Sequence, residues 1–217
     1  MRLGVFRSVP RQVKWLIYLL SFSNVGVGYF WVATSAYLPE RGLTSGDIGV
    51  ILAVNGLAFI VAAIPMGILA DRVGRRPLNL FSGILGAAAT TALVFVGNLP
   101  QLVVAGGLVG AAVGIFLTVN WAWAADMVPL EEAGRYMGLA NIATAGASAV
   151  ARLLAGPLVD GGNLLRQGAG YEILFLVLGL GMLFGVWLLS GVPETRSQPS
   201  QPIVDVIPVE QNDRGLS

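Results

Sequence analysis

The segment from Gly67 to Pro77, with the sequence GILADRVGRRP, places Asp71 and three arginines between two long apolar stretches. The interior of a lipid bilayer holds no water to solvate such charges, so the charges must lie outside the hydrocarbon while the flanking stretches lie inside it. We therefore expect this segment to be a loop between two membrane-spanning helices. Its position sets the register of all the other spans.

The composition also indicates a polytopic membrane protein. Of the 217 residues, 55% are hydrophobic and 12% are charged, whereas a soluble domain has about a quarter charged residues. The sequence contains no cysteine and no histidine, which excludes disulfides, thiol nucleophiles, zinc sites built on these residues and imidazole acid–base chemistry. We therefore expect neither an enzyme nor a cofactor, and a net charge of +1 gives no reason to expect a nucleic-acid partner.

Six apolar stretches are long enough to cross a hydrocarbon core of ~30 Å. They predict an all-α bundle of six transmembrane helices in one domain, 15–192, with a basic segment before it, 1–14, and a disordered polar tail after it, 193–217. A cleaved signal peptide is the alternative for the first stretch, although that stretch exceeds the ~7 to 15 apolar residues of a signal core. The predicted spans are 15–38, 48–70, 78–97, 101–125, 136–159 and 171–192.

Two local patterns predict how these helices pack. The turn formed by Asn98, Leu99 and Pro100 is so short that the third and fourth spans must be antiparallel neighbours. In the fourth span glycine recurs at every fourth position, which lines one helical face with residues that let another backbone approach closely. These glycines are Gly106, Gly110 and Gly114.

The distribution of lysine and arginine predicts the orientation in the membrane. Six spans put both termini on the same side as the loop at 67–77, and the opposite side holds only Arg41 and Arg166. Because basic residues accumulate in cytoplasmic loops, we expect both termini and this loop on the cytoplasmic side of a plasma (inner) membrane. The basic residues on that side are Arg2, Arg7, Arg11, Lys14, Arg72, Arg75, Arg76, Arg135, Arg196 and Arg214.

The loop between the second and third spans resembles the signature loop of the major facilitator superfamily, which reads roughly G-x-L-A-D-R-x-G-R-[RK]. The matching residues are Gly67, Leu69, Asp71, Arg72, Gly74, Arg75 and Arg76. After the sixth span, residues 193–196 read PETR, which is similar to the P-E-T-[KR] that often closes a six-helix half in this superfamily. The resemblance covers residues 15–196. It implies a transporter with two six-helix halves, each made of two inverted three-helix repeats, around a cavity that opens alternately to each side.

Only one such half is present in this sequence. The resemblance therefore implies a carrier for a small-molecule substrate that needs a second six-helix half, either a second copy of the chain or another chain. The first three spans resemble the opening of a full transporter, whereas 124–146 and 156–160 look more like its closing helices, as in a truncated or internally deleted gene. The alternative function is accordingly a non-transporting remnant or a membrane interaction subunit.

In this superfamily the charges of the signature loop form a network with the cytoplasmic end of the fourth helix, and that network latches one conformation. The resemblance implies the same role here, with Glu131 and Glu132 as further acidic partners. The alternative is that these charges only set the topology and hold helix ends together. The predicted latch residues are Gly67, Asp71, Arg72, Gly74, Arg75, Arg76 and Asp126.

Arg152 is the one basic residue inside a predicted span. A charge at that depth costs at least ~2.5 kcal/mol on insertion scales, so it is expected to face the bundle interior or water. Asn141, Thr144 and Ser148 share its helical face and extend a polar stripe that can bind an anionic or hydroxyl-rich substrate. Alternatively, Arg152 reaches the outer interface or pairs with Asp160.

Further substrate contacts follow only from the resemblance. Its geometry places the first and fourth helices at the cavity, which implies Asn24, Trp31, Asn120 and Trp123 as substrate-binding residues. The alternatives are ordinary ones for membrane helices, because tryptophan favours the membrane interface and a single asparagine often bonds across helices.

Overall fold

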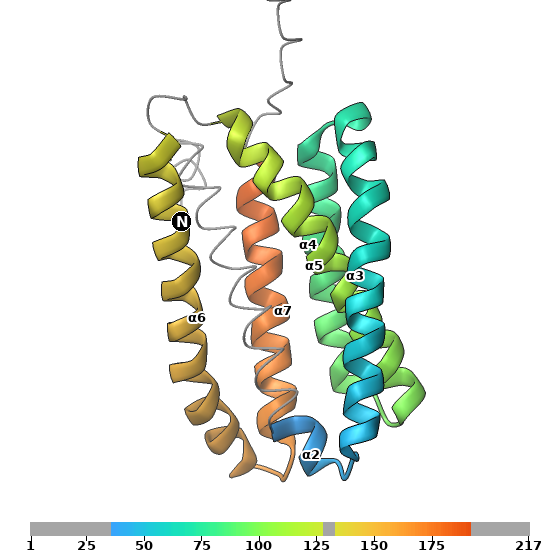
Figure 1. The fold of residues 1–217 in the computed structure, drawn as a ribbon. Helices are drawn as coiled ribbons and strands as arrows, with labels where there is room; N and C mark the ends of the chain where they lie inside the picture. The colour runs from blue at the N-terminus through green and yellow to red at the C-terminus, as the bar shows by residue number, and fades with distance from the viewer. Residues whose placement is uncertain (1–35, 128–132, 192–217) are drawn as a thin grey trace, which may run out of the picture.

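The computed structural model describes residues 36–127 and 133–191 (Figure 1). Within these ranges the chain is helical and contains no strand, which confirms the all-α fold class. The basic segment 1–14, the predicted first span apart from its last residues, and the tail 193–217 lie outside the described residues. Their predicted boundaries therefore stay predictions.

Each of the predicted spans from the second to the sixth corresponds to one long helix. Four of these helices are long and apolar enough to cross a membrane, namely α3, α4 together with a short 3-10 turn, α5 and α7. The helix α6 is also long, at 31 residues, but it carries the polar residues of the predicted fifth span and is not among these four. The elements are α2 (Leu38–Glu40), α3 (Ser45–Val73), α4 (Arg75–Ala92), η3 (Leu93–Phe95), α5 (Leu99–Met127), α6 (Ala133–Asn163) and α7 (Ala169–Ser190).

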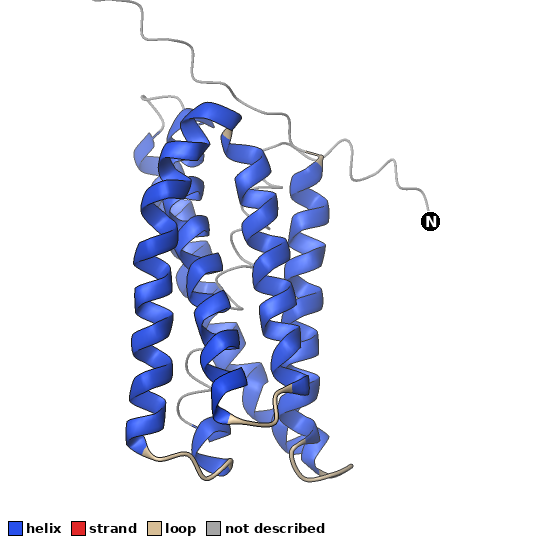
Figure 2. Ribbon diagram, turned by 90° about the vertical axis from the view of Figure 1, so that its right-hand side faces the viewer, coloured by secondary structure: helices blue, strands red, loops and turns tan. Residues whose placement is uncertain are grey.

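The long helices run side by side and alternate in direction (Figures 1 and 2). The helices contact one another in a chain of neighbours: α3 packs mainly on α5, α5 also on α4, α4 on α7, and α7 on α6. We call the end that holds Gly74 the loop end, and the opposite end, which holds the short helix α2, the α2 end. The last turns of α5 and α7 lie at the loop end, and the α6–α7 connection lies at the α2 end (Figure 1).

The turn between α4 and α5 makes these two helices antiparallel neighbours, as predicted. The turn itself is earlier than expected, because Leu99 and Pro100 already belong to the first turn of α5. Proline is compatible with a first helical turn, where its missing N–H would have no intrahelical partner. The Asn98 side chain caps the helix by accepting a hydrogen bond from the Gln101 backbone N–H at 3.0 Å.

Close backbone contact holds α3 against α5, and it uses the glycines that the sequence singled out. A Cβ atom at Gly110 would overlap the Asn55 carbonyl group, and one at Gly114 would overlap the Phe59 carbonyl group. The Asn55 side-chain amide also donates a hydrogen bond of 2.8 Å to the Gly106 carbonyl oxygen. The predicted glycine face is therefore a helix-packing surface.

The core lies between α4, α5 and α7, whereas α3 is mostly covered on one side only. Phe175 and Met182 of α7 are buried there together with Trp123 of α5. By contrast, the outward side chains of α3 are exposed apolar ones, such as Leu57 (62%) and Ile64 (66%). An apolar helix with an exposed apolar face requires either lipid or another protein segment against it.

Candidate functional site

The connection between α3 and α4 is a single glycine at the loop end. The helix α3 ends at Val73, and α4 begins at Arg75. Gly74 between them has a φ of +101°, which residues with a Cβ atom rarely adopt. Its N–H still donates to the Ala70 carbonyl oxygen at 3.0 Å, so α3 continues to its last turn before the chain reverses. This sharp reversal places Asp71 one turn before Arg75.

Asp71, one of the two acidic residues of the predicted latch, makes only a weak contact. The Arg75 guanidinium lies 3.8 Å from an Asp71 carboxylate oxygen, and the Asp71 side chain is 73% exposed. An ion pair with so exposed a carboxylate contributes about 0 to 1 kcal/mol, because water solvates the carboxylate almost as well. Asp71 therefore biases the position of Arg75 without locking it.

The two arginines at the start of α4 reach the ends of two other helices. Arg75, whose side chain is 16% exposed, donates a hydrogen bond to the Ala122 carbonyl oxygen in α5. Arg76 donates a hydrogen bond to the Ser190 carbonyl oxygen, at the last residue of α7. Both carbonyl groups lie toward the negative end of a helix dipole, which attracts guanidinium groups. Ser190 is also among the last four residues of α7, whose carbonyl groups have no intrahelical donor, whereas Ala122 lies just before that last turn of α5. The loop thus joins the ends of α3, α5 and α7.

These carbonyl partners were not predicted from the sequence, which pointed only to acidic residues. Asp126 lies in the last turn of α5, but its side chain, like Glu131 and Glu132, is outside the described residues. No local sequence signal identifies Ala122 and Ser190 as acceptors, since every helix ends in such carbonyl groups. Only the packing of α5 and α7 beside α4 determines which of them the arginines meet.

Gly67 and Arg72, which also belong to the predicted latch, lie in different surroundings. A Cβ atom at Gly67 would lie 3.1 Å from the Thr118 methyl group, so this glycine lets α3 approach α5 near the loop end. Arg72 is exposed, and it makes no hydrogen bond or ion pair with another residue in the described ranges. The structure therefore brings Gly67, Asp71, Arg75 and Arg76 into the loop-end contacts and leaves Arg72 exposed.

Of the five predicted substrate-binding residues, the structure describes the side chains of two. Asn120 and Trp123 are three residues apart on α5, and both side chains are fully buried. Asn24 and Trp31 lie outside the described residues, and for Arg152 only the helical backbone of α6 is described. Their roles in substrate binding stay predictions, and a solute can meet Asn120 or Trp123 only after the helices around them move.

Three polar residues inside the bundle were not predicted from the sequence. Asn79, Ser82 and Thr90 of α4 are all fully buried, at a spacing that keeps them on one helical face. The Ser82 hydroxyl donates to the Asn79 carbonyl oxygen at 2.8 Å, and the Asn79 amide donates to the Arg75 carbonyl oxygen at 3.2 Å. The 3.6-residue period of these polar residues is a signal that a closer reading of the third span would have found.

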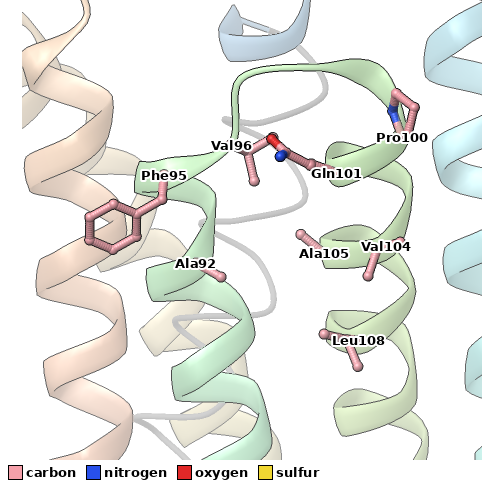
Figure 3. A pocket seen from close by; sticks show the side chains of 8 residues that line it. All are labelled: Ala92, Phe95, Val96, Pro100, Gln101, Val104, Ala105 and Leu108. Carbon is pink, nitrogen blue, oxygen red and sulfur yellow. The ribbon is translucent and has the colours of Figure 1, made fainter.

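Two pockets lie toward the α2 end. One, of about 440 Å³, lies between α4 with η3 and α5 and has an apolar lining except for Gln101 (Figure 3). Gln101 is engaged, because its side-chain oxygen accepts a hydrogen bond of 2.8 Å from the Gly97 N–H. The second pocket, of about 270 Å³, has aromatic and charged lining residues around Tyr37 and Tyr171. Among the described residues, no group of three or more acidic side chains is placed to hold a metal ion.

Comparisons with known proteins agree with this architecture. A model of the family described as Major Facilitator Superfamily matches residues 15–209. The minor myo-inositol transporter IolF of Bacillus subtilis (strain 168) is 30% identical over 176 residues, which cover 79% of this chain and 38% of the relative. The class E tetracycline resistance protein of Escherichia coli is 26% identical over 184 residues, which cover 82% of this chain and 44% of the relative.

The similar solved structures share the fold. The proton:xylose symporter XylE bound to 6-bromo-6-deoxy-D-glucose gives a TM-score of 0.70 at 16% identity. The match covers 85% of this chain and 44% of the symporter chain. The inward-open xylose transporter XylE from E. coli gives a TM-score of 0.65 at 18% identity, and the match covers 85% of this chain and 48% of the transporter chain. The chain thus spans less than half the length of these proteins. With the family model matched along most of the chain and the signature loop placed between α3 and α4, this protein is a member of the major facilitator superfamily.

Proposed function

We propose that this chain forms one six-helix half of a membrane carrier, over residues 15–192, and that it moves a small solute by alternating access. A second half, supplied by a second copy or by another chain, completes the cavity. Family membership supports transport, and the chain's span of less than half of its relatives supports the need for further helices. The uneven distribution of arginine supports an orientation with the loop end in the cytoplasm and the protein in the inner membrane.

The contacts of Arg75 and Arg76 carry the mechanistic part of this proposal. They join α4 to the ends of α5 and α7 by hydrogen bonds to Ala122 and Ser190, while Asp71 adds an exposed ion pair. A hydrogen bond to a charged group contributes about 1.5 to 3 kcal/mol, and the exposed pair contributes less. A few such contacts match the free-energy gap of a few kcal/mol across which a two-state protein can switch. The loop end is therefore suited to act as a latch that is broken and remade during transport.

The proposed substrate contacts are Asn24, Trp31, Asn120, Trp123 and Arg152. Two of the relatives carry names that refer to myo-inositol and tetracycline, which supports a small organic solute as the substrate class. Because Asn120 and Trp123 are buried in the described conformation, we propose that α5 moves relative to its neighbours when the cavity opens.

A second candidate function is a non-transporting remnant or membrane interaction subunit. The observation that favours it is again the short span relative to the transporters that the chain matches. The two candidates differ in one respect that can be measured, which is whether the chain assembles with further helices into a complex that transports a solute.

Crosslinking in native membranes followed by reconstitution of the purified complex in proteoliposomes tests this function. The carrier predicts a crosslinked species with a second half and saturable uptake of at least one solute from a panel of cyclitols, pentoses and organic anions. It also predicts that Arg152→Gln lowers uptake roughly tenfold or more, whereas Arg152→Lys keeps part of it, because a cation at this depth is expensive unless it is used. A chain that stays monomeric in native membranes and moves none of these solutes is the remnant, and the carrier is then excluded.

A further inference from the structure

The pocket of about 270 Å³ at the α2 end is built from segments far apart in the sequence. The N-terminal side contributes Tyr37, Glu40 and Arg41, and the start of α7 contributes Tyr171 and Phe175. The helix α2 and the start of α7 lie at the end opposite the Gly67–Pro77 loop (Figure 1). The pocket is thus remote from the latch, and it is open on its outer side because Glu40 and Arg41 are exposed.

The floor of this pocket is a fixed aromatic cluster. The Tyr37 ring centroid lies 5.0 Å from that of Phe175, edge to face, and 5.3 Å from that of Tyr171. All three side chains are at most 5% exposed, and the Tyr37 hydroxyl donates to the Leu93 carbonyl oxygen at 3.3 Å. Rings packed in this way fix the shape of the pocket, and only the small exposed edges of Tyr37 and Tyr171 are open to a ligand.

The rim of the pocket holds two opposite charges that do not neutralise each other. Glu40 accepts a hydrogen bond of 2.5 Å from the neutral Tyr171 hydroxyl, and Arg41 donates one of 2.5 Å to the Val96 carbonyl oxygen. The Arg41 guanidinium also lies 4.8 Å from the Tyr37 ring centroid. Within the described parts of the chain neither Glu40 nor Arg41 forms an ion pair, although the two residues are adjacent in sequence. Each charge is held in place by a neutral group.

The other two charges at this rim contact each other. One guanidinium nitrogen of Arg166 lies 2.7 Å from each carboxylate oxygen of Glu172. Both Glu172 oxygens take part in this contact, whereas Arg166 is 66% exposed and uses one nitrogen in it. The rim groups that can still bind an ion are therefore the second carboxylate oxygen of Glu40 and the remaining N–H groups of Arg41 and Arg166.

We propose that this pocket binds a small zwitterion of the α-amino-acid type with an apolar side chain. The ammonium group of the ligand donates to Glu40, its carboxylate accepts from Arg41, and its apolar side chain lies against the exposed edges of the Tyr37 and Tyr171 rings. A lone cation or a lone anion satisfies only one of the two charges, and a neutral polyol satisfies neither. Binding at this site does not depend on transport, so it can be tested whether or not the chain is a carrier.

Saturation-transfer NMR on the purified full chain in nanodiscs tests this site, with L-leucine as the probe. We expect a saturable signal for L-leucine, and at least a roughly tenfold weaker affinity for leucinamide and for 4-methylpentanoate, which lack the carboxylate and the ammonium group respectively. Equal affinity for all three compounds would show that only the apolar side chain is recognised. Tighter binding of myo-inositol than of L-leucine would show a polyol site instead. Either result overturns the proposal.

Glu40→Gln is the sharpest variant, because glutamine keeps an oxygen that can accept from the Tyr171 hydroxyl and removes only the charge. We expect it to weaken L-leucine binding roughly tenfold or more while leaving the melting temperature unchanged. Asp47→Asn is the matched control, since Asp47 is another carboxylate at the α2 end, bonded to Thr44 outside the pocket. If Glu40→Gln and Asp47→Asn bind L-leucine equally well, the zwitterion site is excluded.

Discussion

Gly110 of α5 lies so close to the Asn55 carbonyl group of α3 that a single added methyl group would overlap it. The same relationship recurs one turn later between Gly114 and Phe59. These contacts matter because α3 packs mainly on α5, and most of its apolar side chains point away from the bundle. The attachment of α3 therefore depends on this one interface, in which the two glycines allow the closest backbone approach.

Replacing Gly110 by alanine is expected to lower the stability of the bundle. The added Cβ must push α3 away from α5, and overpacking of this kind costs about 1 to 3 kcal/mol. The measurement is the thermal unfolding midpoint of the purified protein in one detergent.

Gly56→Ala is the matched control, because a Cβ at Gly56 has nothing within 4 Å. It should leave the midpoint unchanged or raise it slightly, since alanine is the better helix former. Equal midpoints for Gly110→Ala and Gly56→Ala would mean that the α3–α5 contact does not control stability.

Arg75→Gln should loosen the loop end. The variant loses a charged hydrogen bond to the Ala122 carbonyl oxygen, so we expect a destabilisation of about 1.5 to 3 kcal/mol. Arg72→Gln removes the same charge from an exposed position and should cost less than about 0.5 kcal/mol. Chemical unfolding of the two variants side by side checks this, and a similar cost for both would assign the effect to net charge alone.

Asp71→Asn should have almost no effect on stability. The carboxylate is 73% exposed and 3.8 Å from Arg75, so its contribution is expected to be below about 1 kcal/mol and to vanish in high salt. Unfolding curves at low and high ionic strength measure this. A loss well above 1 kcal/mol that persists in high salt would show that Asp71 has a stronger partner than Arg75.

Cysteine labelling can test the orientation, because the chain contains no cysteine of its own. Val73→Cys lies at the loop end, where the side chain is 53% exposed, and Leu165→Cys lies at the α2 end, where it is 81% exposed. In intact cells a membrane-impermeant maleimide should label Leu165→Cys and not Val73→Cys. The reverse pattern would mean that the loop end faces outward and that the charge distribution does not set the topology here.

Much of the fold follows from the sequence, because lipid imposes simple constraints. A run of about twenty apolar residues has to be a helix that satisfies its own backbone hydrogen bonds, and the charged segment at 67–77 has to lie between two such helices. The spacing of Gly106, Gly110 and Gly114 also predicted a close helix contact before its partner was known. The predicted fourth span begins at residue 101, two residues too late, because Leu99 and Pro100 already belong to α5.

The partners across the bundle were decided only by the tertiary structure. A helical pattern shows which face of a helix packs, but it does not show which other helix covers that face. For this reason the sequence singled out Arg75 and Arg76 without indicating Ala122 and Ser190, whose acceptors are backbone groups common to every residue. It also gave no sign that Tyr37 and Tyr171, 134 positions apart, share one pocket with Glu40, because such a meeting requires the ends of separate helices to converge at one end of the bundle.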